Sequence, residues 1–582
     1  VDEESTVVNR GSVRILVGGA IRGEGTYEQL SGTTVVLGSL DVWNISILGG
    51  TLSGTGYVRP RLEATIGFLE AEATVGFPGE VEVDPGQSPG TLTFGGSVRL
   101  ENAYIKVEID DYQHYDRLVI DGNLTVNQAR MKVFLAEGYA PDLNDRFDWL
   151  STSGTVTGRE NLQIELPNNV PAGWTTQIGE DGNLTVWNDS AVDLFDPFFT
   201  TYVPEGMLAF IDLSRQGLTE YSATERFVIE GQLALFSGST LRPDHGVEIA
   251  STGRMTSRGT IVVDANGGVG GFVNEGRFEN RVGGVFLNDL AGRQLVNRAR
   301  FDNYGQFENR ATVQNDAGAT FQQGGEFVNA PGAKIENEGR FVVSGRVTND
   351  QAEINNAGQF EITDTGRVEG QGTYWQLSPT ASTVVDGRLE AGDLFLYAGR
   401  LSGHGTVASP RAFLGDFGAE EPLVVLPGGE FSVGTLTLEG QASAASTRFV
   451  IDIAGAEHYD RLGVKGDIFF HAGEVAFVLL DSYVPTIGQR FDWLKLANFS
   501  SFYTNEEVLG WTVSQRRADG SLWEFGGSSG FAAGAPVHFT FDGTSLVAAP
   551  VPEPATWALM LGGLAFVAVT ACRRQSLTWN TR

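Results

Sequence analysis

The feature that most constrains the fold is a short repeat in the middle of the chain, between about residues 240 and 368. Its unit is an apolar residue, any residue and then Asn, as in "FVN" from Phe272, "FDN" from Phe301 and "INN" from Ile354. Copies follow one another at about six or eight residues, which is too short for a helical unit, and the gaps carry Gly, Asn, Asp or Ala. The pattern therefore predicts short strands joined by tight corners.

A short strand with one apolar face cannot bury that face alone, but stacking successive strands as rungs buries it. We therefore predict an all-β fold, a parallel β-solenoid (β-helix) with roughly 20 to 25 residues per rung. The Asn side chains point to the same side as the apolar residue two positions earlier and are expected to form amide ladders. An antiparallel sandwich is the alternative, because corners such as Asp121-Gly122 suit hairpins, but such corners are few.

The chain also contains a long internal duplication. Five short stretches recur in the same order about 345 residues later. The pairs are "GEGTYEQLS" with "GQGTYWQLS", "LSGTG" with "LSGHG", "GTLTF" with "GTLTL", "HYDRL" with "HYDRL", and "RFDWL" with "RFDWL". The likeness extends upstream, where "NRGSVRI" matches "NAGQFEI" at the end of the Asn-rich array. We expect the chain to begin inside a truncated array that a signal peptide once preceded.

These patterns predict six segments. They are the end of a truncated array (1–20), a first β module (21–186), a linker and solenoid entry (187–239), the Asn-rich array (240–368), a second copy of the β module (369–548) and a sorting segment (549–582).

The net charge and the residue counts argue against several kinds of partner and binding site. The formal net charge is −32, which argues against nucleic acid or an anionic membrane surface as a partner, since both need Lys and Arg. Cys572 is the single cysteine, so no intramolecular disulfide can form. The six histidines form no close pair, and the sequence holds no EF-hand loop and no phosphate-loop lysine. We expect no metal site and no cofactor.

One repeated motif invites a catalytic interpretation. In "HYDR", His114 could act as a base, Asp116 could orient it, and Arg117 could bind an anionic substrate. The same four residues recur as His458, Tyr459, Asp460 and Arg461 inside a matching strand pattern that includes Trp149 and Trp493. A motif used twice beside core aromatics favours a packing role, so we expect no catalytic residues.

The C-terminal segment is of a different kind. Residues 555–572 carry no charge, which is close to the shortest span that can cross a bilayer, and Arg573 and Arg574 follow at once. The positive-inside bias predicts that these arginines stay in the cytoplasm and stop the membrane passage, with everything before residue 555 outside. We therefore expect a single C-terminal transmembrane helix.

This tail resembles the PEP-CTERM sorting signal of Gram-negative bacteria. The resemblance rests on Pro552, Glu553 and Pro554, the apolar span, and the basic pair Arg573-Arg574. It implies processing near the Pro-Glu-Pro motif by an exosortase, a membrane-embedded cysteine protease. Proteins with this signal are associated with exopolysaccharide and biofilm production. The "YDRL" modules also resemble repeats of such proteins and of autotransporter passengers, a likeness that concerns fold rather than activity.

Together these features predict a non-enzymatic structural or adhesive protein, an adhesin of the cell surface or biofilm matrix. We expect it to be exported, held transiently in the inner membrane by its C-terminal helix, processed by exosortase and then delivered to the surface, with exopolysaccharide as a further partner. The alternative is a secreted β-helix protein that binds or degrades polysaccharide.

Overall fold

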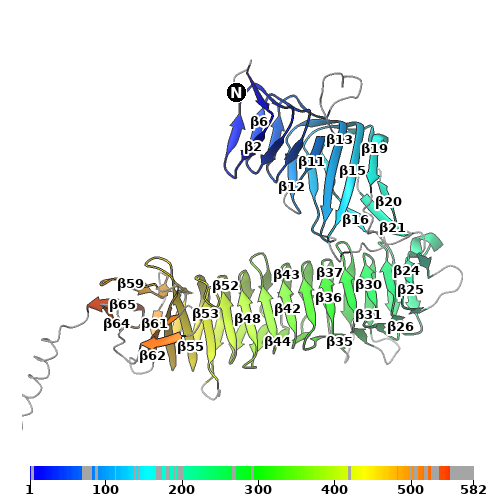
Figure 1. Cartoon of the computed structure of the whole chain (residues 1–582). Coiled ribbons are helices and arrows are strands. Elements are labelled where there is room, and N and C mark those ends of the chain that lie inside the picture. The colour runs from blue at the N-terminus through cyan, green and yellow to red at the C-terminus, as the bar shows by residue number, and fades with distance from the viewer. Residues whose placement is uncertain are drawn as a thin grey trace, which may run out of the picture. The chain divides into compact units, whose positions relative to one another are not determined.

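In the computed structural model the chain folds as two compact units, residues 1–192 (unit 1) and 193–582 (unit 2), and both consist of stacked β-strands (Figure 1). The structure describes residues 1, 5–67, 81–85, 89–111, 113–136, 139, 145–165, 174–178, 184–188, 191–194, 201–264, 271–289, 294–416, 421–480, 483–497, 501–503, 509–516, 522–525 and 537–550. Within these residues the helices are two short 3₁₀ turns, η2 (Arg159–Asn161) and η3 (Leu213–Gln216).

Each turn of the Asn-rich array in unit 2 has three strands, one on each of three faces. One turn consists of β35 (Gln294–Asn297), β36 (Arg300–Asn303) and β37 (Gln306–Asn309). Each strand pairs in parallel with the equivalent strand of the next turn, for example Arg300 with Thr320 and Gln306 with Glu326. The parallel pairing confirms the β-solenoid and excludes the sandwich, and the two units together hold about 18 turns.

The array strands fall into three columns. Face 1 holds β32 (Phe272–Asn274), β35, β38 (Thr312–Asn315), β41 (Lys334–Asn337), β44 (Glu353–Asn356), β47 (Thr373–Gln376), β50 (Asp393–Leu396) and part of β52 (Thr406–Leu414). Face 2 holds β33 (Arg277–Asn280), β36, β39 (Thr320–Gln323), β42 (Arg340–Val343), β45 (Gln359–Ile362), β48 (Ser382–Val385) and β51 (Arg400–Gly403). Face 3 holds β34 (Val285–Asp289), β37, β40 (Glu326–Asn329), β43 (Arg346–Asn349), β46 (Arg367–Glu369) and β49 (Arg388–Glu390).

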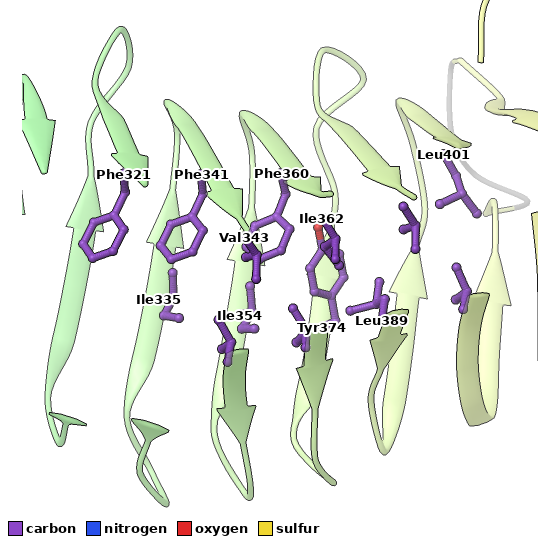
Figure 2. Close-up of a cluster of buried hydrophobic side chains, with 14 of the residues drawn as sticks. Phe321, Ile335, Phe341, Val343, Ile354, Phe360, Ile362, Tyr374, Leu389 and Leu401 are labelled. Atoms are coloured by element: carbon purple, nitrogen blue, oxygen red, sulfur yellow. The ribbon is translucent and has the colours of Figure 1, made fainter. Parts of the chain in front are cut away.

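The core is a set of side-chain columns that run along the solenoid axis (Figure 2). Phe321, Phe341 and Phe360 occupy one column, with ring centroids 4.7 and 5.1 Å apart and planes only 3° from parallel. Beside them, Ile335, Ile354 and Tyr374 form a second column. Since parallel strands place identical positions directly above one another, a repeat of identical residues becomes a stack of identical side chains.

The repeated asparagines form the predicted amide ladders, and these are buried. On face 1, Asn274 donates from Nδ2 to Oδ1 of Asn297, and Asn297 does the same to Asn315, both at 2.8 Å. The ladder continues to Asn337 and Asn356 at 2.7 and 2.9 Å. The second N–H of each amide binds a corner carbonyl of the next turn, as from Asn315 to Arg340 O. Every amide of this ladder therefore joins two turns and also satisfies a partly buried corner carbonyl.

Two shorter ladders run on the other faces, and all three have the same direction. Asn280 leads to Asn303 on face 2, and Asn288 leads to Asn309, Asn329 and Asn349 on face 3. Because each amide donates toward the C-terminus, the first Oδ1 of a ladder receives nothing from the turn before it. Among the described residues, the buried Oδ1 atoms of Asn274, Asn280 and Asn288 are accordingly left without a donor.

The duplicated modules are built alike. In unit 1, β1 (Thr6–Asn9), β4 (Thr26–Gln29), β7 (Asn44–Ile47) and β10 (Glu63–Gly67) pair in sequence on one face, as β44, β47, β50 and the end of β52 do in unit 2. Each module ends in an antiparallel pair, β20 (Trp174–Ile178) with β21 (Leu184–Asn188) in unit 1 and β64 (Val537–Phe541) with β65 (Ser545–Pro550) in unit 2. These pairs switch the strand direction where the parallel stack ends.

Two predictions are not decided by this architecture. No helix of the described residues is long and apolar enough to cross a membrane, and the predicted transmembrane segment at 555–572 lies outside those residues. The predicted segment boundaries also stay predictions, although the division between the two units at residues 192 and 193 falls inside the predicted linker of 187–239.

Candidate functional site

The His-Tyr-Asp-Arg motif lies at the same corner in both modules. In unit 1 the corner connects β13 (Ser97–Ile109) to β14 (Arg117–Ile120), and in unit 2 it connects β55 (Thr447–Ile453) to β56 (Arg461–Lys465). An isolated antiparallel bridge closes each corner, from Ile109 to Tyr115 in unit 1 and from Ile453 to Tyr459 in unit 2. The motif therefore forms the corner between a long strand and a short one, four or five residues in length, in both modules.

The aspartate of each motif holds two backbone segments together. Asp116 is fully buried and accepts hydrogen bonds from Gly90 N at 2.7 Å and Glu108 N at 2.9 Å. Asp460 accepts in the same way from Gly434 N and Asp452 N, at 2.7 and 3.0 Å. Burial raises the pKa of Asp116 to about 6 and that of Asp460 to about 8, because the ionised form loses its water, and the backbone donors offset this only in part.

The tyrosine and arginine of each motif support the same corner. The hydroxyl of Tyr115 accepts from Asp148 N at 3.3 Å, and Tyr459 accepts from Asp492 N at 3.2 Å. The Arg117 guanidinium lies 4.9 Å from the centre of the Tyr115 ring, and the Arg461 guanidinium lies 4.1 Å from that of Tyr459. The neighbouring Trp149 and Trp493 are buried, so the aromatic residues belong to the core.

The structure does not assemble the catalytic arrangement that the motif suggested. His114 Nδ1 lies 2.8 Å from Oδ2 of Asp111, and not beside Asp116, whose two oxygens are engaged by the backbone. Its side chain is 66% exposed. In unit 2 the position equivalent to Asp111 is Gly455, so the His–carboxylate pair is not repeated. Because the contact between His114 and Asp111 occurs in one copy alone, we interpret it as a local surface contact.

Sequence reasoning missed several buried carboxylates, and Asp452, on strand β55, is the one that lies at this corner. It is 2% exposed and its neighbour in the corner is Asp460. Burial raises the pKa of Asp452 to about 7, while a backbone hydrogen bond from Phe431 and the charge of Arg516 act in the opposite direction. The signal in the sequence was the run "RFVIDI", in which an aspartate stands amid an apolar strand. Among the described residues no three His, Cys, Asp or Glu side chains form a metal-binding group.

The sorting segment begins where the last solenoid strand ends. Strand β65 ends at Pro550, and the predicted site residues Pro552, Glu553, Pro554, Arg573 and Arg574 lie outside the described residues. The PEP-CTERM protein-sorting motif matches residues 550–575, which include all five. Comparison with curated proteins gives no match. The chain thus carries a PEP-CTERM motif on a β-solenoid, which indicates an exported protein that is addressed to an exosortase and directed to the cell surface.

Proposed function

We propose that this protein is a non-enzymatic structural or adhesive component of the extracellular matrix or biofilm, delivered by exosortase processing. The observation that carries the proposal is the sorting motif at 550–575, placed directly after a solenoid of stacked turns. A solenoid presents long regular surfaces and needs no bound group to fold, which suits a protein that builds or coats a surface.

The repeated corner supports a non-enzymatic role. Asp116 and Asp460 each accept two backbone N–H groups, so neither is available to orient a histidine. A raised pKa in a buried carboxylate is often a sign of catalysis. Here each carboxylate is engaged by two backbone N–H groups of its corner, which favours a structural role.

The route of export forms part of the proposal. The apolar span at 555–572 would hold the chain in the inner membrane with Arg573 and Arg574 in the cytoplasm, while exosortase cuts near Glu553 on the outer side. A span of this length is short for a permanent anchor, and Gly562 and Gly563 weaken it as a helix. Both features suit a temporary hold followed by release to the surface.

The test replaces Pro552, Glu553 and Pro554 with alanine in the native host. The matched control replaces Glu421 and Pro422, an exposed Glu-Pro pair within the solenoid. We expect the motif variant to accumulate uncut in the inner membrane and the control to reach the surface like the parent, as judged by fractionation and immunoblotting. Normal surface delivery of the motif variant would refute exosortase processing. The alternative is a secreted β-helix protein that binds or degrades polysaccharide, and an aromatic stack on the surface of unit 2 favours binding.

A further inference from the structure

Three aromatic side chains form a stack on the outside of face 1 in unit 2. Trp375, Phe395 and Phe413 occupy the outward position of successive strands, since Trp375 pairs with Phe395 and Phe395 with Phe413. The ring centroids of the first two lie 4.0 Å apart with planes 17° from parallel, and those of the second two lie 5.3 Å apart at 10°. Phe413 is 39% exposed. Outward aromatic residues that stack in register are costly to leave in water, so this column requires an explanation.

The stack ends at Trp375, beside a hollow in the surface. Phe395 covers one face of the indole, and the preceding positions of the same column are Asn355 and Glu336. These two polar residues help to line a hollow of about 680 Å³ together with Trp375, Glu338, Glu353 and Leu377. Most of these residues precede Trp375 along the column, so the hollow lies on the side of the indole opposite Phe395. Phe395 and Phe413 therefore support a tryptophan whose other face forms the wall of a hollow.

The other walls are acidic. Glu336, Glu338 and Glu353 line the hollow, and among its described lining residues there is no Lys, Arg or His. Lys334, just outside, pairs with Glu353 at 2.8 Å. Asn355 donates from Nδ2 to Oε1 of Glu336 at 2.8 Å, which fixes the floor between the carboxylates and the indole. The hollow thus combines a flat aromatic wall with hydrogen-bond acceptors of negative charge.

The first module serves as an internal comparison. At the positions of Trp375, Phe395 and Phe413 it has Glu28, Ser46 and Thr65, which pair with one another in the same register. The interior of the two modules is alike, so folding does not demand the aromatic residues. The aromatic column is therefore a feature of the second module alone.

We propose that this hollow binds a polysaccharide that contains unacylated amino sugars. A pyranose ring has an apolar C–H face that can stack on Trp375, and an edge of hydroxyl and ammonium groups that can reach Glu336, Glu338 and Asn355. A protonated amine gains from both the carboxylates and the indole face. Acidic polysaccharides are disfavoured by these carboxylates and by the net charge of −32. This binding role rests on the proposed function, since it names the polysaccharide that a protein of the extracellular matrix would bind.

The test measures binding of a glucosamine hexamer to the purified full chain by calorimetry at low salt. We expect binding that weakens at 0.5 M salt, that falls about tenfold or more in Trp375→Ala, and that falls several-fold in Glu338→Gln, which removes an exposed charge without touching the core. Trp43→Ala is the matched control, because Trp43 is an exposed tryptophan of unit 1, and it should bind like the parent. Should Trp375→Ala fail to fold, Trp375→Glu supplies the residue that the first module tolerates.

Several outcomes would overturn the proposal. These are absence of hexamer binding, equal binding by Trp375→Ala with an unchanged melting temperature, or equal affinity for a galacturonate hexamer. Equal affinity for a lysine-rich peptide of the same charge would assign the hollow to a cationic protein segment and equally refute a glycan partner. Because these measurements use purified protein, a failure of exosortase sorting in the native host would leave them unaffected, and the two proposals can fail separately.

Discussion

The two copies of the duplicated module differ mainly in what they present to the outside and in what charge they bury. Inside, Tyr27, Thr34 and Gln29 of the first copy make the same contacts as Tyr374, Thr383 and Gln376 of the second. The tyrosine hydroxyl meets the threonine hydroxyl at 2.7 Å in one copy and 2.6 Å in the other, and the threonine donates to the glutamine in both.

Each network also accepts hydrogen bonds from an asparagine of the preceding turn. Asn9 donates to Gln29 and Thr34, and Asn356 donates to Gln376 and Thr383. In unit 2 the Asn ladder of face 1 ends at this network. The equivalent position in the next turn is occupied by an apolar residue, Leu396, which pairs with Gln376. The buried polar network is repeated as a whole because leaving one of its members unpaired costs free energy. The outward positions are not constrained in this way and differ between the copies.

The largest effect should come from breaking this network in either copy. Gln29→Ala and Gln376→Ala each remove an amide that bonds two carbonyls of the next turn, at 2.8 and 3.2 Å in the first copy and 2.6 and 3.2 Å in the second. We expect each variant to destabilise its own unit by about 3 kcal/mol, because several buried groups lose partners.

Scanning calorimetry of the full chain, with hydrogen exchange to assign each transition to its unit, measures this effect. The control is Gln371→Ala, an exposed glutamine of unit 2, which should change nothing. A loss confined to one of the two network variants would show that the networks are not equivalent in energy.

The second prediction concerns pH and should separate the copies. The folded pKa values of Asp452 and Asp460, about 7 and 8, lie above the ordinary aspartate value of about 3.9. The folded state therefore holds protons that the unfolded state releases, and the stability of unit 2 should fall as pH rises from about 4 through 8. For unit 1 the corresponding fall through Asp116 should end near its pKa of about 6.

Asp452→Asn tests this prediction directly. Removing a buried charge should raise the melting temperature of unit 2 at pH 8.5, by the equivalent of a few kcal/mol, and should have little effect at pH 5. Glu108→Gln is the matched variant at the equivalent position of unit 1, where Glu108 pairs with Lys106 at 2.6 Å, and it should give no gain at pH 8.5. An equal gain at both pH values would mean that Asp452 acts through packing and not through its charge.

A third prediction exchanges the outward columns. The triple variant Trp375→Glu, Phe395→Ser and Phe413→Thr gives the second module the outward residues of the first. We expect the melting temperature of unit 2 to change by the equivalent of about 1 kcal/mol or less, because the first module has the same interior without these aromatic side chains and outward strand positions contribute little. Thermal unfolding followed by circular dichroism measures this, and a loss comparable to that of Gln376→Ala would show that the aromatic column stabilises the fold.

The smallest effect is expected at the histidines. His114→Ala combined with His458→Ala removes one exposed contact to Asp111 in the first copy and should shift stability by less than about 0.5 kcal/mol. Any polysaccharide-degrading activity of the preparation should remain as it was. A large loss of turnover by the folded double variant would restore the catalytic interpretation of the motif.

Much of the fold could be predicted because the repeat carries its own register. The apolar-x-Asn unit indicates which residues point inward, and parallel stacking then places Asn on Asn and Phe on Phe, as in the ladder from Asn297 to Asn315 and the stack from Phe321 to Phe341. The rung length was also predicted closely, since paired array strands such as those starting at Arg300 and Thr320 lie 20 residues apart. The spacing of the repeat along the chain equals the offset between paired strands, because each turn of a solenoid pairs with the next turn.

The candidate sites could be predicted from the sequence only in part. The sequence by itself determined the sorting motif, since recognition of a short linear signal depends on residue order and not on tertiary neighbours. It also determined that the aspartate of the His-Tyr-Asp-Arg motif recurs, but not what the aspartate binds. Only the tertiary structure decided that Asp116 and Asp460 hold backbone amides, because Gly90 and Gly434 lie 26 residues away along the chain. The hollow beside Trp375 likewise required the structure, because the glutamates that line it come from neighbouring turns and meet the indole only when those turns stack.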